Sequence, residues 1–376
     1  MTIFKPLSAD DRVSTKTLLH EAIPITGTIV SGTYGTFPNE RNVQNFTHGM
    51  FQSVYDYPYL SSSANHIFDL TVGTSANSTL AVTSMAAKKD NIYNQMAQVL
   101  SGYNVDGEIQ NFDEDGNIVA GGDKINDALF VSFSRLLAKD EIKKGSFELE
   151  LGVSSSYSKP FGKRIKILDQ GAATSYKVNS PAGEYGILYA TASAGANILD
   201  RTSTHTASIN GSTYWRAGLI YYQAGLIVLT SSILSATGSI GGFGFLHNLA
   251  GPIKKLDFDG TGTTLTGSIV AQEISGSSNF LRHRIYNMQF NNTIELNSTV
   301  YFCRAKHNEF NYSSNPTYLS GSQIRVKNES TDIPISYITS IGLYSADNQL
   351  LAVGKFSEPI RKDSNIELTF RGRLDY

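Results

Sequence analysis

The sequence predicts an α+β protein that is mainly β, with β-sandwich-like antiparallel sheets and two short helices. Charged residues make up only 17% of the chain, compared with roughly 25% in ordinary soluble domains. Tyr and Phe, which favour strands, number 20 and 19, and 33 glycines can supply turns. Short apolar runs separated by Ser, Thr, Asn and Gly clusters complete a pattern that is typical of many strands joined by polar turns.

Residues 1–160 are expected to form an N-terminal α+β domain. Ile23 and Ile25 predict a first strand, the segment 33–40 a loop, and the run 66–73 a second strand. A strict alternation of apolar and other residues predicts a further strand, because successive side chains of a strand point to opposite faces. Its apolar members are Phe147, Leu149, Leu151 and Val153.

The same domain is expected to contain two helices, at about 90–101 and 123–140. Asp90 is a suitable N-terminal cap for the first helix, and Gly102 would end it. The second would carry a broad apolar stripe at helical spacing, made by Ile125, Leu129, Phe133, Leu136 and Leu137.

Residues 161–280 are expected to form a Gly/Ser/Thr-rich β domain or an insertion. Apolar runs predict strands at 165–168 and 186–190, and the run 219–229 predicts one or two buried strands. The segment 235–278 has little charge and many Gly, Ser and Thr residues, which predicts an insertion or a mobile loop region.

Residues 281–376 are expected to form a C-terminal β domain that closes with a hairpin. Strands are predicted at 282–290 and 299–305, with a turn-rich connector at 308–318. Apolar residues alternate on both sides of a polar turn at 345–349 and predict the hairpin: Ile341, Leu343, Leu351 and Val353. After a break at Pro359, a half-buried strand is predicted, with Ile366, Leu368 and Phe370 on one face and Glu367, Thr369 and Arg371 on the other.

Charge and cysteine content limit the kinds of partner. The net charge is −2 and the isoelectric point is near 6.4, so no global field attracts nucleic acid or an anionic membrane. Cys303 is the only cysteine, which excludes an intrachain disulfide. The first residues lack the features of a signal peptide, and no apolar run reaches the roughly 18 residues that cross a bilayer. We therefore expect no nucleic-acid partner and no membrane anchor.

Two acidic segments have some of the residues of a cation site. In 113–117, Gly116 stands fourth and Lys124 twelfth, whereas a calcium loop of the EF-hand type needs Gly sixth and Glu twelfth. A polar turn is therefore expected there, and an Asp-Gly hairpin turn is expected at 257–262. The histidines are scattered and have no partner at ligand spacing: His20, His48, His66, His205, His247, His283 and His307.

The sequence also lacks the tested motifs for catalysis and phosphate binding. No serine lies in a Gly-x-Ser-x-Gly elbow, and Cys303, in a strand-like run, is expected to be a small buried apolar residue. The glycine cluster at 238–244 lacks the Lys-Ser/Thr of a phosphate loop. Two basic groups are interpreted as solvated strand faces: Lys159, Lys163, Arg164 and Lys166, and then Arg282, His283 and Arg284. The sequence predicts no catalytic, cofactor-binding or metal site.

Aromatic residues are the candidates for a binding role. Tyr55, Tyr57 and Tyr59 fall at alternate positions, so an extended chain would place them on one side. They either line a partly buried loop and strand or form a subunit interface, where Tyr is enriched. The candidate interface residues are Tyr55, Tyr57, Tyr59, Phe310, Tyr312, Tyr344, Phe356 and Phe370.

The C-terminal hairpin, SIGLYSADNQLLAVGKFSEPI, is similar to a pattern of tail and baseplate proteins of tailed bacteriophages. The matching residues are Ile341, Gly342, Leu343, Tyr344, Asn348, Leu350, Leu351, Ala352, Val353, Gly354 and Lys355, while Ser345 stands where Asp is common. Two upstream stretches look like segments of virion structural proteins from large contractile-tailed phages: HGMFQSVYDYPYLSSSANHIFD (48–69) and FCRAKHNEFNYSSNPTY (302–318). The resemblance covers about a third of the chain.

The resemblance implies a non-enzymatic structural protein of a virion, assembled in the host cytoplasm and placed in the tail baseplate. Its partners would be other tail or baseplate subunits, in a homo- or hetero-oligomer. Three alternatives stay open: a receptor- or glycan-binding tail tip, a neck or head-associated structural protein, and a polysaccharide-degrading tail hydrolase. The last would need a pair of carboxylates in a cleft, which sequence alone does not identify.

Overall fold

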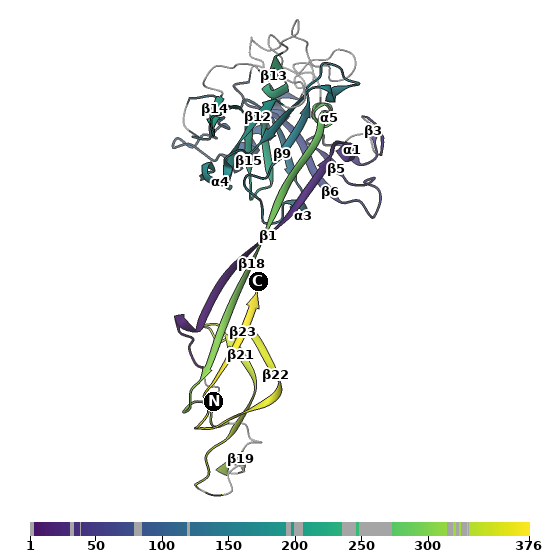
Figure 1. Ribbon diagram of the computed structural model, residues 1–376. Coiled ribbons are helices and arrows are strands. Elements are labelled where there is room, and N and C mark those ends of the chain that lie inside the picture. Colours follow the sequence, from purple (N-terminus) through teal and green to yellow (C-terminus); the bar gives the residue numbers. More distant parts are fainter. Residues whose placement is uncertain are drawn as a thin grey trace. The chain divides into compact units, whose positions relative to one another are not determined.

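The computed structural model describes residues 4–30, 34–37, 39–78, 85–118, 121–192, 197–198, 206–234, 246–247, 273–313, 319–320, 323–324, 329 and 331–376. The chain divides into two compact units. The large unit is His20–Ile294, and the terminal unit combines Met1–Leu19 with Glu295–Tyr376 (Figure 1). The domain boundaries predicted at residues 160 and 280 do not coincide with this division.

The large unit is built on one long antiparallel sheet. Its strands follow the order β18-β9-β10-β12-β15-β16-β7-β6-β5-β4, and each neighbouring pair is antiparallel. The bounds are β4 Val43–Asn45, β5 Gln52–Tyr55, β6 His66–Thr74, β7 Asp127–Phe133, β9 Glu148–Gly152, β10 Arg164–Leu168, β12 Gly183–Ala192, β15 Ser212–Tyr221, β16 Leu226–Thr230 and β18 Ile285–Ala305. The prediction of a mainly β, antiparallel fold is confirmed.

Shorter strands and helices complete this unit. The strands are β2 Gly35–Thr36, β3 Asn39–Glu40, β8 Glu141–Ile142, β11 Lys177–Ser180, β13 Asn197–Ile198, β14 Thr206–Ile209 and β17 Leu246–His247. The helices are α1 Gly27–Val30, α2 Ala86–Leu100, α3 Arg135–Ala138, α4 Ala172–Ser175 and α5 Ile274–His283, with short 3-10 turns at η2 Pro160–Gly162 and η4 Ser231–Leu234. In the part of the chain that the structure describes, none of the helices is long and apolar enough to cross a membrane.

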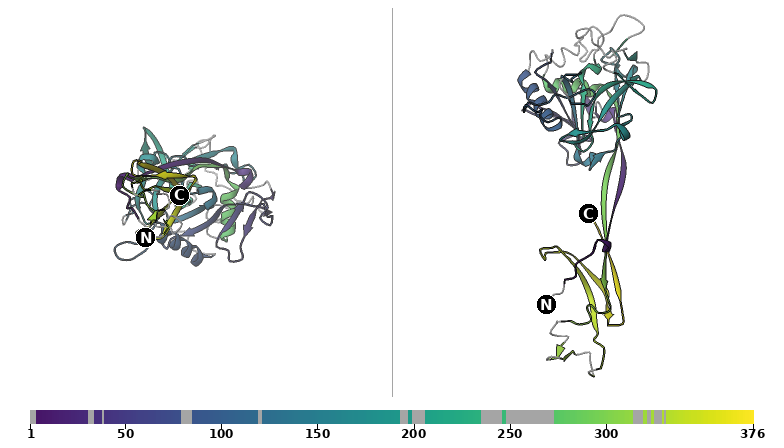
Figure 2. Two further views of the ribbon diagram at one scale, coloured as in Figure 1. Left: turned by 90° about the horizontal axis from the view of Figure 1, so that it is seen from below. Right: turned by 90° about the vertical axis from the view of Figure 1, so that its left-hand side faces the viewer.

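Apolar side chains cover both faces of the sheet. Leu129 and Val131 of β7 belong to one core cluster, and Ala128 and Phe130 of the same strand belong to another. Helix α2 packs on the second face through residues that include Tyr93 (Figure 2). Because alternate residues of a strand face opposite ways, a strand between two cores must be apolar at consecutive positions.

That double burial explains why the helix predicted at 123–140 is wrong. Residues 127–133 form β7, and only the four residues of α3 are helical. Ser134 caps α3, since its Oγ accepts a hydrogen bond from the Leu136 N–H at 3.3 Å. The apolar positions of a strand covered on both faces include those of a helical stripe, so spacing alone did not separate the two.

The first predicted helix is confirmed with a shifted start. Helix α2 begins at Ala86, and Asp90 lies inside it rather than at its cap. The Asp90 carboxylate instead accepts a hydrogen bond from Thr74 Oγ1 at 2.8 Å. The predicted end holds: Gly102 adopts a left-handed φ of 81° and its N–H reaches the Ala97 carbonyl at 3.0 Å.

The strands predicted at 66–73, around Phe147–Val153, and in the runs at 165–168, 186–190 and 219–229 are present. The last run forms two strands, β15 and β16, joined by a turn at 222–225. Residues 282–283 end helix α5 instead of starting a strand, and β18 then continues through the second predicted strand at 299–305. Residues 248–272 of the predicted insertion, which include the turn at 257–262, lie outside the described residues, as do 235–245 with the glycine cluster.

The terminal unit consists of extended antiparallel strands. β23 (Leu368–Asp375) pairs with β18, with Ser298 opposite Asp375 and Ala305 opposite Leu368. On the path of sheet neighbours, β1 (Arg12–Thr26) also lies beside β18. A second sheet pairs β21 (Ser336–Tyr344) with β22 (Leu350–Lys362). The remaining elements are η1 Ala9–Asp11, β19 Leu319–Ser320 and β20 Gln323–Ile324.

The predicted C-terminal hairpin is confirmed as β21 and β22. Its turn is closed by a hydrogen bond from the Ser345 N–H to the Gln349 carbonyl at 2.9 Å. Pro359 does not break the strand but lies inside β22. The predicted last strand is also confirmed: Ile366, Leu368 and Phe370 are half-buried, and Glu367, Thr369 and Arg371 are exposed.

Candidate assembly interfaces

The terminal unit has almost no core of its own. Among its described residues, Ala305 is the only apolar side chain that is buried. Large apolar side chains are instead exposed along β1, β18, β21, β22 and the connecting segments: Phe4, Leu7, Val13, Leu18, Leu19, Leu296, Phe310, Tyr312, Ile333, Tyr337, Tyr344, Leu350, Leu351, Val353 and Tyr376. These side chains are therefore candidates for contact with other chains.

Five of the predicted interface residues lie in this unit. Phe356 of β22 and Phe370 of β23 contact each other, with ring centroids 4.8 Å apart, and both are half-buried. Tyr344 meets the ring of Phe4 edge to face at 4.7 Å. The other two, Phe310 and Tyr312, are exposed in the segment that follows β18. No periodic pattern surrounds Phe4, so the sequence alone gave no reason to expect this contact.

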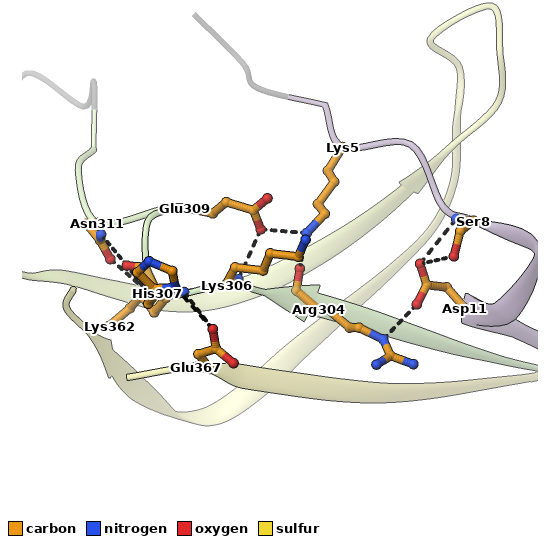
Figure 3. Close-up of polar contacts among 10 residues, drawn as sticks. All are labelled: Lys5, Ser8, Asp11, Arg304, Lys306, His307, Glu309, Asn311, Lys362 and Glu367. Carbon is orange, nitrogen blue, oxygen red and sulfur yellow. Dashed lines mark hydrogen bonds and ion pairs between the residues drawn. The ribbon is translucent and has the colours of Figure 1, made fainter. Parts of the chain in front are cut away.

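Polar contacts attach the N-terminal segment to the end of β18 (Figure 3). Lys5 Nζ donates to the Glu309 carboxylate at 2.5 Å and to the Arg304 carbonyl at 2.9 Å. Asp11 accepts from Ser8 Oγ and, at 2.7 Å, from Arg304 Nε. The Ser8 hydrogen bonds lower the pKa of Asp11, with Arg304 adding to the effect, and the Lys5 ammonium lowers the pKa of Glu309.

A second group of polar contacts surrounds Lys362 (Figure 3). This lysine is fully buried, and its Nζ donates to the His307 carbonyl at 3.2 Å, to Asn311 Oδ1 at 2.6 Å and to the Asp363 carbonyl at 2.8 Å. His307 Nδ1 lies 3.2 Å from the Glu367 carboxylate and lowers the pKa of that group. Hydrogen bonds and ion pairs therefore hold this unit together where apolar burial does not.

The three predicted tyrosines lie in the large unit and do not share one face. Tyr55 ends β5, and its ring contacts that of Tyr59 at 6.3 Å, whereas Tyr57 contacts Tyr34 at 5.3 Å. The Tyr55 hydroxyl donates to Gln44 Oε1 at 3.1 Å, and burial raises its pKa. Tyr55 and Tyr59 are half-buried, and Tyr57 is exposed. The chain bends directly after Tyr55, so the alternation of an extended chain ends there.

The interpretation of Arg282 and Arg284 as solvated residues is wrong. Arg282 is fully buried and forms a two-pronged ion pair with Glu40, at 2.9 and 3.1 Å. Its guanidinium also donates to the Val30 carbonyl at 2.8 Å and to Gln52 Oε1 at 3.2 Å. Arg284 is buried as well and donates to the Gly152 carbonyl at 3.0 Å. Buried guanidinium groups that donate hydrogen bonds in this way join segments that are distant in the sequence.

The other basic group behaves as predicted where it forms pairs on strand faces. Arg164 Nε lies 3.0 Å from the Glu150 carboxylate on neighbouring strands β10 and β9. Lys166 Nζ lies 2.7 Å from Glu148 in the same pair of strands. Both are partly exposed, so these pairs contribute little stability.

One buried carboxylate of the large unit has an unusual environment. Asp169 accepts hydrogen bonds from the Gly145 N–H at 2.6 Å, from the Phe147 N–H at 3.0 Å and from the Tyr222 hydroxyl at 3.3 Å. Burial outweighs these donors and raises the pKa of Asp169 to about 6. The carboxylate holds the turn that precedes β9, which is a structural task.

The remaining chemical candidates stay structural or fall outside the described residues. Asp113 is bound by Lys124 Nζ in a turn, and no group of three or more metal-ligating side chains occurs among the residues that the structure describes. Cys303 is partly buried, and burial raises the pKa of its thiol. His205 lies outside the described residues.

Comparisons of the chain with protein-family models, with curated proteins and with solved structures found no match. The large unit has a complete core, and the terminal unit presents its apolar side chains to solvent.

Proposed function

We propose that the chain is a non-enzymatic assembly protein whose terminal unit is completed by other protein chains. The observation that carries this proposal is the single buried apolar side chain, Ala305, among the described residues of that unit. Apolar burial is the main favourable term in folding, and a few strands without a covered apolar face are marginal in water. Contacts with other chains would supply the missing burial, as in obligate interfaces, which resemble a domain core divided between subunits.

Within that class, we propose a structural component of the tail baseplate of a bacteriophage virion. The support is the resemblance of the hairpin around Ile341–Lys355 to tail and baseplate proteins. That hairpin forms β21 and β22 in the terminal unit, and its side chains Leu350, Leu351 and Val353 are exposed. The proposed partners are other tail or baseplate subunits, and the proposed location is the assembled virion.

The test is to locate the chain in particles of the phage that encodes it. Particles are purified, labelled with an antibody against the large unit coupled to gold, and imaged by electron microscopy. We expect the label at the baseplate end of the tail. Label at a fibre tip would favour a receptor-binding role, and label at the neck or head would favour those structural positions. Absence of the chain from purified particles would overturn the proposal.

A glycan array separates the receptor-binding alternative from the assembly role. The full chain is applied at concentrations up to the micromolar range. An assembly component is expected to bind no glycan above background. Saturable binding to one glycan class would shift the assignment to an adhesin.

A further inference from the structure

We infer that the terminal unit packs against the same unit of other copies of this chain, in a closed ring of at least three copies. The inference rests on the proposed function, because it names the partner that completes the assembly surface. Four observations lead to it: a strand uncovered on both faces, the amount of exposed aromatic surface, a balanced charge, and a scaffold held by polar contacts.

One strand of this unit, β1, is uncovered on both faces. Leu18 and Leu19 of β1 are neighbours in the sequence and therefore point to opposite faces, yet they are 49% and 48% exposed. All residues of β1 from Arg12 to Leu19 are exposed. Partners are therefore needed on two sides of the ribbon.

The exposed area matches what a stable interface requires. Among its described residues, the unit has six aromatic side chains that are 36 to 72% exposed: Phe4, Phe310, Tyr312, Tyr337, Tyr344 and Tyr376. At about 200 Å² for each aromatic side chain, their exposed part is on the order of 600 Å², and the exposed Leu, Val and Ile residues add to it. A stable interface buries roughly 800 Å² on each partner.

The charge of the unit favours a second copy over a strongly charged partner. Residues 1–19 and 295–376 contain twelve Lys and Arg and eleven Asp and Glu, a net charge of +1. Described examples of both signs are already paired within the unit, such as Arg304 with Asp11 and Arg373 with Asp375. Copies of such a surface can approach one another without net electrostatic repulsion. A strongly charged partner would gain little electrostatic attraction from a surface with a net charge near zero.

The number of copies follows from the two uncovered faces. A twofold dimer contact uses one patch on each subunit and would leave the other face of the ribbon in water. A head-to-tail ring gives every subunit two neighbours, and three is the smallest number of copies that closes such a ring.

The polar contacts around Lys362 and between Lys5 and Glu309 hold the segments of each copy together without the burial that neighbouring copies would add.

The first test is the mass of the purified full chain at neutral pH, measured by analytical ultracentrifugation. We expect at least three times the 40.9-kDa chain mass. Leu351→Lys places a charge on a side chain that is 67% exposed in the single chain, and it should shift the population to smaller species. Leu136→Lys is the matched control on the large unit, where Leu136 is 58% exposed, and it should leave the mass unchanged. A monomer or dimer of the native chain would overturn the inference.

A second test needs no variant. Hydroxyl-radical labelling compares Tyr337 of the terminal unit, 55% exposed, with Tyr103 of the large unit, 52% exposed. In the oligomer, Tyr337 should react at less than a third of the rate of Tyr103, and equal rates would overturn the inference. A monomeric chain that is nevertheless present in virions would refute the ring alone. A ring-forming chain that is absent from virions would refute the proposed virion role alone.

Discussion

The two units of this chain show opposite ways of stabilising β-strands. In the large unit, β7 lies between two apolar clusters, so Phe130 and Val131 are both buried although they point to opposite faces. In the terminal unit, Leu18 and Leu19 of β1 also point to opposite faces, and both are exposed. Apolar alternation in the sequence therefore shows which side chains of a strand need to be buried. It does not show whether the same chain or another chain buries them.

The units also differ in how they use charge. The large unit buries one ion pair completely, that of Arg282 and Glu40. The terminal unit mostly keeps its ion pairs in water, as with Lys5 and Glu309 or Arg304 and Asp11. Breaking a buried pair costs far more than breaking an exposed one. Substitutions are therefore expected to lower stability more in the large unit than in the terminal unit.

The largest effect is expected from Arg282→Ala in the large unit. The substitution leaves the Glu40 carboxylate buried without the guanidinium that holds it, which costs about 3 to 5 kcal/mol of unfolding free energy. Chemical denaturation monitored through the fluorescence of Trp215, a residue of this unit, measures the loss. Lys166→Ala is the control: Lys166 pairs with Glu148 at 2.7 Å, but both side chains are partly exposed, so the loss of this pair should cost less than about 1 kcal/mol. Equal losses for the two variants would contradict the contrast.

Particular residues also show which parts of the structure could be predicted from the sequence. The hairpin at Ile341–Val353 and the strand around Leu149 were predictable, because each alternates in a way that a single strand produces. Strand β7 was not predictable. Because it is buried on both faces, it has apolar residues at the positions where an apolar stripe of a helix would also have them. The burial of Arg282 was also beyond reach, because its partner Glu40 lies 242 positions earlier in the chain.

The candidate interface was predictable only in part. Aromatic content pointed to Phe356 and Phe370, which do meet in the structure, but it grouped Tyr57 with two tyrosines that it does not contact. No sequence signal showed that the terminal strands lack a core. A half-buried strand has the same alternation whether its cover comes from its own chain or from another, and only the burial of each side chain separates the two cases.

The second prediction concerns Asp169 and pH. Its pKa is about 6 in the folded chain and near 3.8 when unfolded, so the folded state binds more protons between about pH 4 and 6. Stability of the large unit should therefore fall as pH rises through that window, by on the order of 3 kcal/mol from this group. Asp169→Asn should flatten this part of the profile, measured as unfolding free energy against pH.

A second variant sharpens that prediction. Tyr222→Phe removes a hydroxyl that lowers the pKa of Asp169, so the fall in stability should move to higher pH. Profiles of the native chain and Asp169→Asn that run parallel from pH 4 to 7 would refute the assignment of the slope to Asp169.

The smallest effect is expected in the terminal unit, with the opposite pH sign. The pKa values of Asp11 and Glu309 are lowered in the folded chain, by Ser8 and by Lys5 respectively. Their contribution is therefore present above the unfolded pKa values and is lost as pH falls below about 4. Hydrogen exchange of residues 5–12, corrected for intrinsic rates, should speed up as pH falls from 5 to 3. Glu309→Gln should show part of that increase already at pH 5, because a neutral amide cannot form the ion pair with Lys5. Exchange rates in this segment that are independent of pH and unchanged in the variant would show that these ion pairs do not hold the N-terminal segment.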